Sequence, residues 1–370
     1  MPLADELISP ATVELLRDAV LEQRPGTEAS ALSAAVEGMK GLTLRARTDL
    51  LRDAYLSDCG ASFAEVQRVT TAALARDDFA GWLIWPVGEA VAAAALAELG
   101  SNPSAFEAAL YLLADLTPRL TSEWAIRPLL SRDLDRALLV VREWTMHPDE
   151  HVRRFASEGT RQYLPWGTQV AGLAADPRIT LPILDALYRD PSEYVRRSVA
   201  NHLNDLSRKH PEVVCETATR WLADGDENTS QLVKHSLRTL VKKGDPEALA
   251  LLGFAPVVGV EVTGPAVETS AVALGEALPF AITLRNVGTQ PQRMVVDYTL
   301  FHQKANGTQT GKVFKLTTAT LQPGQTLELR RSHSFAVIST RKYHPGQHAI
   351  EVQLNGSPVG RVDFELTVPA

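Results

Sequence analysis

Two patterns of apolar and polar positions divide the chain. From about Pro10 to Ala250, apolar residues recur at helical spacing between short Gly, Pro, Asp and Asn breaks, without strand-like alternation. After Gly253 the pattern changes to short runs rich in β-branched and aromatic residues, separated by turn sequences. The predicted strands are 257–262, 280–284, 294–300, 326–329, 348–354 and 362–368. The chain is therefore predicted to contain a helical domain, 1–255, and a β domain, 256–370.

The helical domain contains an internal repeat. The segment 147–154 aligns with 190–197 at an offset of 43 residues, and a weaker echo begins at Gln231. Periods near 40 residues with two helices per unit are typical of HEAT-like arrays, whose concave face binds long partners. Short strands with turns such as Asn306-Gly307 and Asn355-Gly356 between them indicate an immunoglobulin-type sandwich. The predicted fold is an all-α HEAT-like repeat solenoid followed by a C-terminal antiparallel β-sandwich of immunoglobulin-like type.

Each repeat is predicted to carry a polar stripe beside an apolar stripe that faces the core. The apolar stripes are Val152, Phe155, Ala156 and Gly159 in the first repeat, and Val195, Val199, Leu203 and Leu206 in the second. The polar stripes are Arg154, Glu158 and Arg161, and then Arg197, Asn201, Asp205 and Arg208. Since Arg154 and Arg197 occupy equivalent positions, we expect the two polar stripes to run side by side.

Two interpretations of these stripes remain open from the residues alone. Ordinary salt bridges on solvated helices would explain each Arg/Glu pair at a few tenths of a kcal/mol. Alternatively, a row of arginines suits a phosphate backbone, because the planar guanidinium donates two parallel hydrogen bonds. Carboxylates facing a polyanion would then need a reason, and a positive charge that develops during a reaction would provide one. Glu123, in a predicted helix start at Thr121 or Ser122, has the same two interpretations.

The net charge of −7 argues against a nucleic-acid partner until its distribution is considered. Residues 1–110 carry 16 acidic and 8 basic side chains. Residues 151–210 carry nine basic and six acidic side chains, and residues 301–350 carry seven basic side chains against one acid. The basic charge is therefore concentrated in the middle and rear of the chain, where it could meet nucleic acid.

Four blocks in this order resemble the AlkC family of DNA glycosylases, in the HEAT-like alkylpurine glycosylase superfamily that also holds AlkD. They are 121–128 (TSEWAIRP), 152–159 (VRRFASEG), 164–167 (LPWG) and 194–205 (YVRRSVANHLND). The motif-rich match covers roughly 115–211, and the helical organisation extends it over about 40–255. The immunoglobulin-like C-terminal domain resembles that of the AlkC branch that carries one.

The resemblance implies a monofunctional glycosylase that excises 3-methyladenine and 3-methylcytosine from duplex DNA without flipping the base. It implies that Glu123, Glu158 and Asp205 are the active-site carboxylates. Such residues suit the chemistry, because a cationic base is a good leaving group and its loss builds positive charge on the sugar, which carboxylates stabilise. The segment Arg161-Gln162-Tyr163 departs from the Arg-Pro-Arg expected of the family, which puts a local phosphate contact in doubt.

The residues predicted to contact DNA are mainly arginines of these blocks. They are Arg127, Arg153, Arg154, Arg161, Trp166, Arg196, Arg197, Asn201, Arg208, Arg341 and Lys342. Trp166 could meet a base with its π-face or fill a helix junction as a hydrophobic plug. The segment 341–346 could contact the DNA backbone or minor groove, or form a solvated loop.

No cofactor is expected. The nine histidines lack paired metal-ligand spacing, the two cysteines lie far apart, and no phosphate-cradling glycine loop occurs. The N-terminus lacks a secretory pattern and no run is long enough to span a membrane, so we expect a cytoplasmic protein. The resemblance implies that its partner is double-stranded DNA containing alkylated bases, and we expect it to act as a monomer. The rival hypotheses are a HEAT scaffold for a protein partner and a DNA-binding protein without catalysis.

Overall fold

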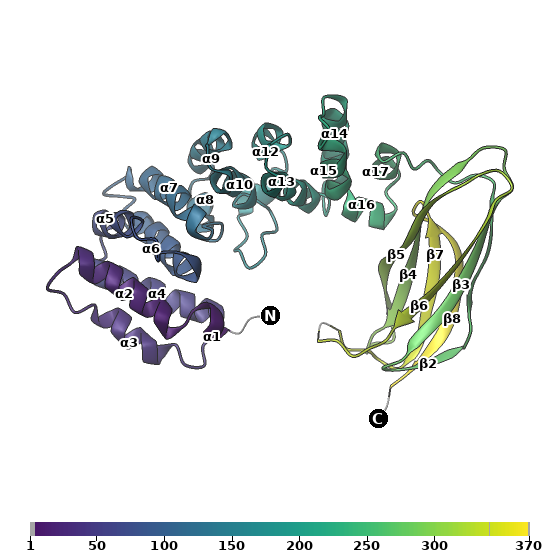
Figure 1. Ribbon diagram of the computed structural model, residues 1–370, viewed down its shortest axis with the longest axis horizontal. Coiled ribbons are helices and arrows are strands. Elements are labelled where there is room, and N and C mark those ends of the chain that lie inside the picture. Colours follow the sequence, from purple (N-terminus) through teal and green to yellow (C-terminus); the bar gives the residue numbers. More distant parts are fainter. Residues whose placement is uncertain (1–3, 340, 369–370) are drawn as a thin grey trace. The chain divides into compact units, whose positions relative to one another are not determined.

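The computed structural model describes residues 4–339 and 341–368. Its helices begin with α1 (Ala4–Leu7), α2 (Pro10–Gln23), α3 (Ser30–Gly38), α4 (Leu44–Cys59), α5 (Phe63–Ala73), α6 (Ile84–Ala97), α7 (Ala105–Leu116), α8 (Arg127–Arg132) and α9 (Leu134–Glu143). They continue with α10 (Glu150–Glu158), α11 (Ala171–Ala175), α12 (Leu181–Leu187), α13 (Glu193–Leu206), α14 (Pro211–Ala223), α15 (Thr229–Ser236), α16 (Arg238–Lys243) and α17 (Pro246–Leu251). Short 3-10 helices occupy Gly81–Leu83, Thr117–Arg119 and Trp144–Met146. Helices α2 to α13 follow one another along a curved row, as a repeat solenoid requires (Figure 1).

The two predicted repeats are confirmed as neighbouring helices. Helix α10 packs against α13, and every residue of both predicted apolar stripes is buried. Asp149 caps α10 by accepting a hydrogen bond from the His151 amide at 2.7 Å, so the helix starts where the Pro-Asp sequence predicts. Repeat spacing and apolar periodicity together therefore place the two polar stripes on adjacent helices.

Equivalent arginines fasten each repeat to its surroundings. Arg153 donates from Nη1 to the carbonyl oxygens of His147 and Pro148 at 2.9 and 2.8 Å. Arg196 makes the same bonds one repeat later, to the carbonyl oxygens of Asp190 and Pro191 at 2.6 and 2.9 Å. Arg153 also holds both carboxylate oxygens of Asp190, at 2.7 and 3.1 Å, which ties the two repeats together.

The β domain is a sandwich of two sheets. Its strands are β1 (Val260–Val267), β2 (Ala271–Ala273), β3 (Ala277–Asn286), β4 (Gln292–Gln303), β5 (Gln309–Leu321), β6 (Thr326–Ser334), β7 (Gly346–Leu354) and β8 (Ser357–Thr367). One sheet has the order β1-β3-β6 and the other β2-β8-β7-β4-β5, and every pairing is antiparallel except β2 with β8. Buried Phe280 and Ile282 of one sheet share a core with Tyr298 and Ile350 of the other. The predicted fold class is thus confirmed in both parts.

Strands β2 and β5 were not predicted. The residues of β5 are half-buried or exposed along nearly all of its length, with lysines and threonines on both faces, so an apolar alternation is lacking. The predicted turn at Asn355-Gly356 joins β7 to β8 with both residues at positive φ, 44° and 78°, as a two-residue hairpin of this type needs.

By its internal contacts the chain divides into two compact units, residues 1–213 with 221–236, and residues 214–220 with 237–370. The last two helices belong to the second unit, where Leu249 and Phe254 pack against Val295 of β4. The Asn355 amide donates to the Ala255 carbonyl at 2.6 Å within the same unit. The domain boundary at residue 255 stays a prediction. None of the described helices is both long and apolar enough to cross a membrane.

Candidate active site

Glu123 lies in a turn before α8, and its side chain is 8% exposed. The Thr121 hydroxyl accepts a hydrogen bond from the Glu123 amide at 3.3 Å and donates to Oε2 of the same residue at 3.0 Å. The helix start predicted at Thr121 or Ser122 is wrong, because α8 begins at Arg127 and its N-cap residue, Ile126, makes no side-chain cap bond. Pro128 in the first turn, where a proline is best tolerated, fixes the later start.

Glu158 is the last residue of α10 and is 5% exposed. Its Oε1 accepts a hydrogen bond from Nη1 of Arg161 at 2.5 Å, and its Oε2 accepts one from the Ser198 hydroxyl at 2.6 Å. Ser198 comes from α13, so the repeat contact between α10 and α13 positions this carboxylate.

Asp205, near the end of α13, is 4% exposed. Arg161 donates to both of its carboxylate oxygens, from Nε at 2.9 Å and from Nη2 at 3.2 Å. One guanidinium therefore serves two carboxylates from adjacent repeats.

The three predicted carboxylates are brought together by two arginines, as predicted for polar stripes that run side by side. Arg154 donates from Nη1 to Glu123 at 2.8 Å and lies 3.7 Å from Glu158, and Arg161 then joins Glu158 to Asp205. We call this alternating series, Glu123, Arg154, Glu158, Arg161 and Asp205, the carboxylate–guanidinium chain. Its three negative and two positive groups leave one net negative charge.

Burial and ion pairing shift the pKa values of Glu158 and Asp205 in the carboxylate–guanidinium chain in opposite directions. Burial would raise the pKa of the Glu158 carboxyl, but Arg154, Arg161 and the Ser198 hydroxyl together outweigh it, so its pKa lies below the usual value. For Asp205 burial dominates over the bonds from Arg161, and its pKa is raised. The surroundings of Glu158 thus favour its ionised form, whereas those of Asp205 favour the uptake of a proton.

A buried polar network supports Glu158 from behind. Ser198 lies 3.0 Å from the Ser157 hydroxyl, and Nδ1 of His202 lies 2.9 Å from the Ser157 carbonyl oxygen. Burial lowers the pKa of His202 to about 3, so its ring is neutral at pH 7. Sequence reasoning missed Ser198 and His202, although both stand inside the recognised block 194–205.

Several residues predicted to contact DNA make hydrogen bonds within the protein. Arg127 is 1% exposed, and its guanidinium donates to the carbonyl oxygens of Gly159, Arg161 and Thr168 at 2.8 to 3.1 Å. It therefore holds the loop after α10 in place. Arg153 and Arg196 fasten the repeats as described above, and Arg154 and Arg161 donate hydrogen bonds to carboxylates. Each of these five arginines thus holds a neighbouring backbone segment or carboxylate in place, and their contacts with DNA stay predictions.

Other predicted contact residues lie nearer the surface of the first unit. Arg197 is exposed and pairs with Glu193 at 2.7 Å. Arg208 is exposed and its guanidinium lies 4.2 Å from the ring centroid of Tyr163. Asn201 is half-buried, with its Oδ1 3.0 Å from Nε2 of His235. Their contacts with DNA stay predictions.

Trp166 projects from the loop after α10, 57% exposed and with a left-handed φ of 61°. Its ring stacks on Trp124 at a centroid distance of 6.1 Å, and Trp124 in turn lies 4.4 Å from buried Trp85. The Trp124 indole donates to the Pro165 carbonyl at 3.0 Å, which fixes the loop to this stack. An exposed residue in an uncommon backbone conformation is held here by a stack that the sequence did not reveal, so Trp166 is no buried plug.

In the second unit, Arg341 is half-buried and its guanidinium contacts His302, and Lys342 is exposed. Their DNA contacts also stay predictions. Within residues 4–339 and 341–368, no cluster of three or more His, Cys, Asp or Glu side chains could hold a metal ion.

Comparisons with known proteins agree with this architecture. The family model for the C-terminal Ig-like domain of the uncharacterised protein YhaZ matches residues 261–368. An uncharacterized protein YhaZ of Bacillus subtilis (strain 168) is 36% identical over 261 residues, which cover 70% of this chain and 72% of the relative. The alkylpurine DNA glycosylase AlkC of Pseudomonas fluorescens, solved bound to DNA containing an abasic site analog, is 31% identical and superposes with a TM-score of 0.89, over 99% of this chain and 100% of that one.

Fold and site together define a HEAT-like repeat protein with an appended immunoglobulin-like domain. More specifically, the chain belongs to the AlkC family, in the branch that carries this C-terminal domain.

Proposed function

We propose that this chain is a monofunctional DNA glycosylase that hydrolyses the N-glycosidic bond of cationic alkylated bases in duplex DNA. The observation that carries the proposal is the carboxylate–guanidinium chain, which assembles Glu123, Glu158 and Asp205 with one net negative charge. The similarity of the whole chain to the alkylpurine DNA glycosylase of Pseudomonas fluorescens supports it.

The reaction breaks the bond between the base nitrogen and C1′ of the deoxyribose. The electron pair leaves with the base and neutralises its positive ring, so no general acid is needed, in contrast to ordinary glycosidases. Positive charge then develops on the sugar, where Glu123 and Glu158 stabilise it. Water adds to C1′ and gives its proton to a carboxylate, which leaves a free base and an abasic sugar.

We assign the proton-accepting role to Asp205. Its pKa is raised by burial, whereas the pKa of Glu158 is lowered by its two arginines and Ser198. A raised pKa makes the Asp205 carboxylate a stronger base than an ordinary aspartate, while the guanidinium of Arg161 beside it favours the ionised form that must accept the proton. Glu158 is then suited to a purely electrostatic role.

The two arginines of the carboxylate–guanidinium chain reduce the negative charge that the site presents to DNA. Three bare carboxylates would repel the phosphates of DNA, but Arg154 and Arg161 cancel two of the three charges. One negative charge remains for the cationic lesion and sugar. We infer that these arginines position the carboxylates and reduce their repulsion of DNA.

The substrates in this proposal are 3-methyladenine and 3-methylcytosine, excised without flipping the base from the duplex. We propose that exposed Trp166 meets a base or sugar at the lesion, and that Arg197, Asn201 and Arg208 contact the same DNA. Arg341 and Lys342 would add contacts from the second unit. The protein would act as a cytoplasmic monomer at the nucleoid.

The test is release of free bases from duplexes that each carry one lesion, 3-methyladenine, 3-methylcytosine or 1-methyladenine, with enzyme in excess and EDTA present. We expect the first two to be released at full rate under EDTA. A protein scaffold would release none. A lesion-binding protein without catalysis would bind the duplexes but release none, so binding measured on the same samples separates these rivals.

A further inference from the structure

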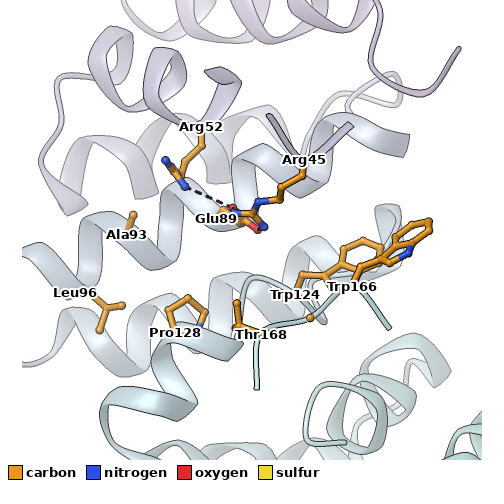
Figure 2. A pocket seen from close by; sticks show the side chains of 10 residues that line it. Arg45, Arg52, Glu89, Ala93, Leu96, Trp124, Pro128, Trp166 and Thr168 are labelled. Atoms are coloured by element: carbon orange, nitrogen blue, oxygen red, sulfur yellow. Dashed lines mark hydrogen bonds and ion pairs between the residues drawn. The ribbon is translucent and has the colours of Figure 1, made fainter. Parts of the chain in front are cut away.

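A small cavity lies beside the tryptophan stack, within the first unit. It is formed by α4, α6, the start of α8 and the loop after α10, and its volume is about 200 Å³. Figure 2 shows charged side chains on one side of it and Trp124, Pro128 and Thr168 on the other. The lining includes none of the three carboxylates of the carboxylate–guanidinium chain.

One edge of the cavity is polar and firmly held. Glu89, 8% exposed, accepts at Oε1 from Trp85 and from Arg45, at 2.8 and 2.7 Å, and at Oε2 from Arg45 at 2.8 Å. Each carboxylate oxygen can accept two hydrogen bonds, so Oε2 retains one free position. The fixed carboxylate is thus an acceptor aimed at the cavity.

A donor lies beside this acceptor. Nη1 of Arg52 is 3.8 Å from Oε2 of Glu89 and donates to Asp49 at 2.9 Å, and Nε of the same guanidinium donates to Asp53 at 2.8 Å. In the described part of the chain, no residue accepts a hydrogen bond from Nη2 of Arg52. The edge therefore offers a free acceptor position on Glu89 beside the guanidinium of Arg52, which keeps Nη2 as a free donor.

The remaining walls are apolar and flat. They comprise Ala93 and Leu96 of α6, the rings of Trp124 and Trp166, and Pro128. A cavity of roughly 150 Å³ is known to hold a benzene ring, so this one has room for a single heteroaromatic base. Indole rings favour such planar ligands by stacking.

Charge decides between a phosphate and a base as the occupant. The two guanidiniums of Arg45 and Arg52 are matched against the carboxylates of Glu89, Asp49 and Asp53, which leaves one net negative charge. Arg45 bonds to both oxygens of Glu89 and both of Asp49, so it has little left for an anion. A neutral or protonated planar molecule is favoured over a phosphate.

We propose that this cavity binds a free nucleobase with an amidine edge, which is a ring nitrogen next to an exocyclic amino group, as in adenine and cytosine. The amino group donates to Oε2 of Glu89, and the ring nitrogen accepts from Nη2 of Arg52. Alkylation of adenine at N3 leaves its N1 and N6 edge intact. Of the two bases that the enzyme is proposed to release, 3-methyladenine is therefore the natural source of such a ligand, because methylation at N3 blocks the amidine edge of cytosine; this step rests on the proposed function.

The experiment titrates the full-length protein, without DNA, with adenine and with purine, which lacks the amino group, and follows the ligand resonances by NMR. We expect saturable adenine binding and affinity for purine weaker by roughly tenfold or more, because purine leaves Glu89 without its donor. No saturable binding of adenine, or equal affinity for the two, would overturn the proposal.

Two substitutions in α6 test whether adenine binds in this cavity. Ala93→Phe fills it, and Ala97→Phe adds the same group at an exposed position one turn further along the helix. We expect Ala93→Phe to weaken adenine binding by roughly tenfold or more and Ala97→Phe to change it by less than about twofold. Equal binding by both would place the site elsewhere. Because no DNA is present, a negative result here leaves the test of base release untouched.

Discussion

Arg161 donates from Nε and Nη2 to both carboxylate oxygens of Asp205, at 2.9 and 3.2 Å, and so joins two residues that lie 44 positions apart. Both side chains are buried, and the same guanidinium also holds Glu158. The bond from one repeat to the next is therefore also the bond that assembles the site. On the proposed function, stability and catalysis therefore depend on the same arginine.

Arg161→Ala is expected to destabilise the protein by about 3–5 kcal/mol, because it leaves the buried charge of Asp205 without its partner and removes one of the two arginines beside Glu158. The control is Arg197→Ala, which removes an exposed pair with Glu193 and should cost about 1 kcal/mol or less. Urea denaturation of both variants measures the difference. Similar losses in the two would show that Arg161 is no more than a surface ion pair.

Ser198→Ala should make the rate of base release fall more steeply on the acid side. The hydroxyl donates to Glu158 and helps to lower the pKa of that carboxyl, so its removal raises this pKa, and Glu158 then loses its charge at a higher pH, alongside Asp205, whose pKa burial raises. The pH–rate profiles of wild type and variant measure the change in the acid limb. A lower rate with an unchanged limb would point to a merely structural serine.

Buried His202 should make the helical unit less stable in acid. Its folded-state pKa of about 3 lies below its ordinary value of 6.5, so between these pH values the unfolded chain takes up a proton that the folded state refuses. Each such histidine lowers the free energy of unfolding by up to about 1.4 kcal/mol per pH unit in this window. We expect His202→Asn to flatten the dependence between pH 6 and 4 by about that slope. An unchanged slope would mean that His202 titrates normally.

Trp166 should contribute to DNA binding and little to folding. Its ring is 57% exposed, and base–aromatic stacking is worth about 1–3 kcal/mol, so Trp166→Ala should weaken binding to a duplex with an abasic-site analogue by that amount. Because φ is 61°, Trp166→Gly should be at least as stable as Trp166→Ala while binding DNA equally poorly. Unchanged affinity in both variants would exclude Trp166 from the interface.

The sequence predicted the repeats and the side-by-side polar stripes, but not the contacts that the arginines make within the protein. The 43-residue repeat offset and the apolar periodicity together predicted that α10 lies beside α13. This helix contact brings Arg161 to Asp205. Periodicity cannot tell a guanidinium that faces solvent from one that turns toward backbone carbonyls. Arg127 is such a case, because its partners are carbonyl oxygens of a loop that lies more than 30 residues further along the chain.

The long-range contacts between tryptophans could not be predicted from the sequence either. Trp85, Trp124 and Trp166 come from three separate segments, and only the tertiary fold stacks them. In the sandwich, β5 escaped prediction because its side chains are largely half-buried or exposed, which removes the period-two signal. In both cases the sequence carries no pattern that identifies which distant segment will lie beside these residues.

The most direct test compares wild type with Asp205→Asn in single-turnover release of 3-methyladenine from duplex DNA, with binding measured on the same duplex. Asparagine keeps the shape of the side chain and removes its charge and basicity. We expect wild type to release the base, and the variant to be slower by roughly 10²–10⁴-fold at an affinity within a few-fold of wild type. Equal rates in the two proteins, or no release by wild type at enzyme excess, would contradict an active site built on Glu123, Glu158 and Asp205.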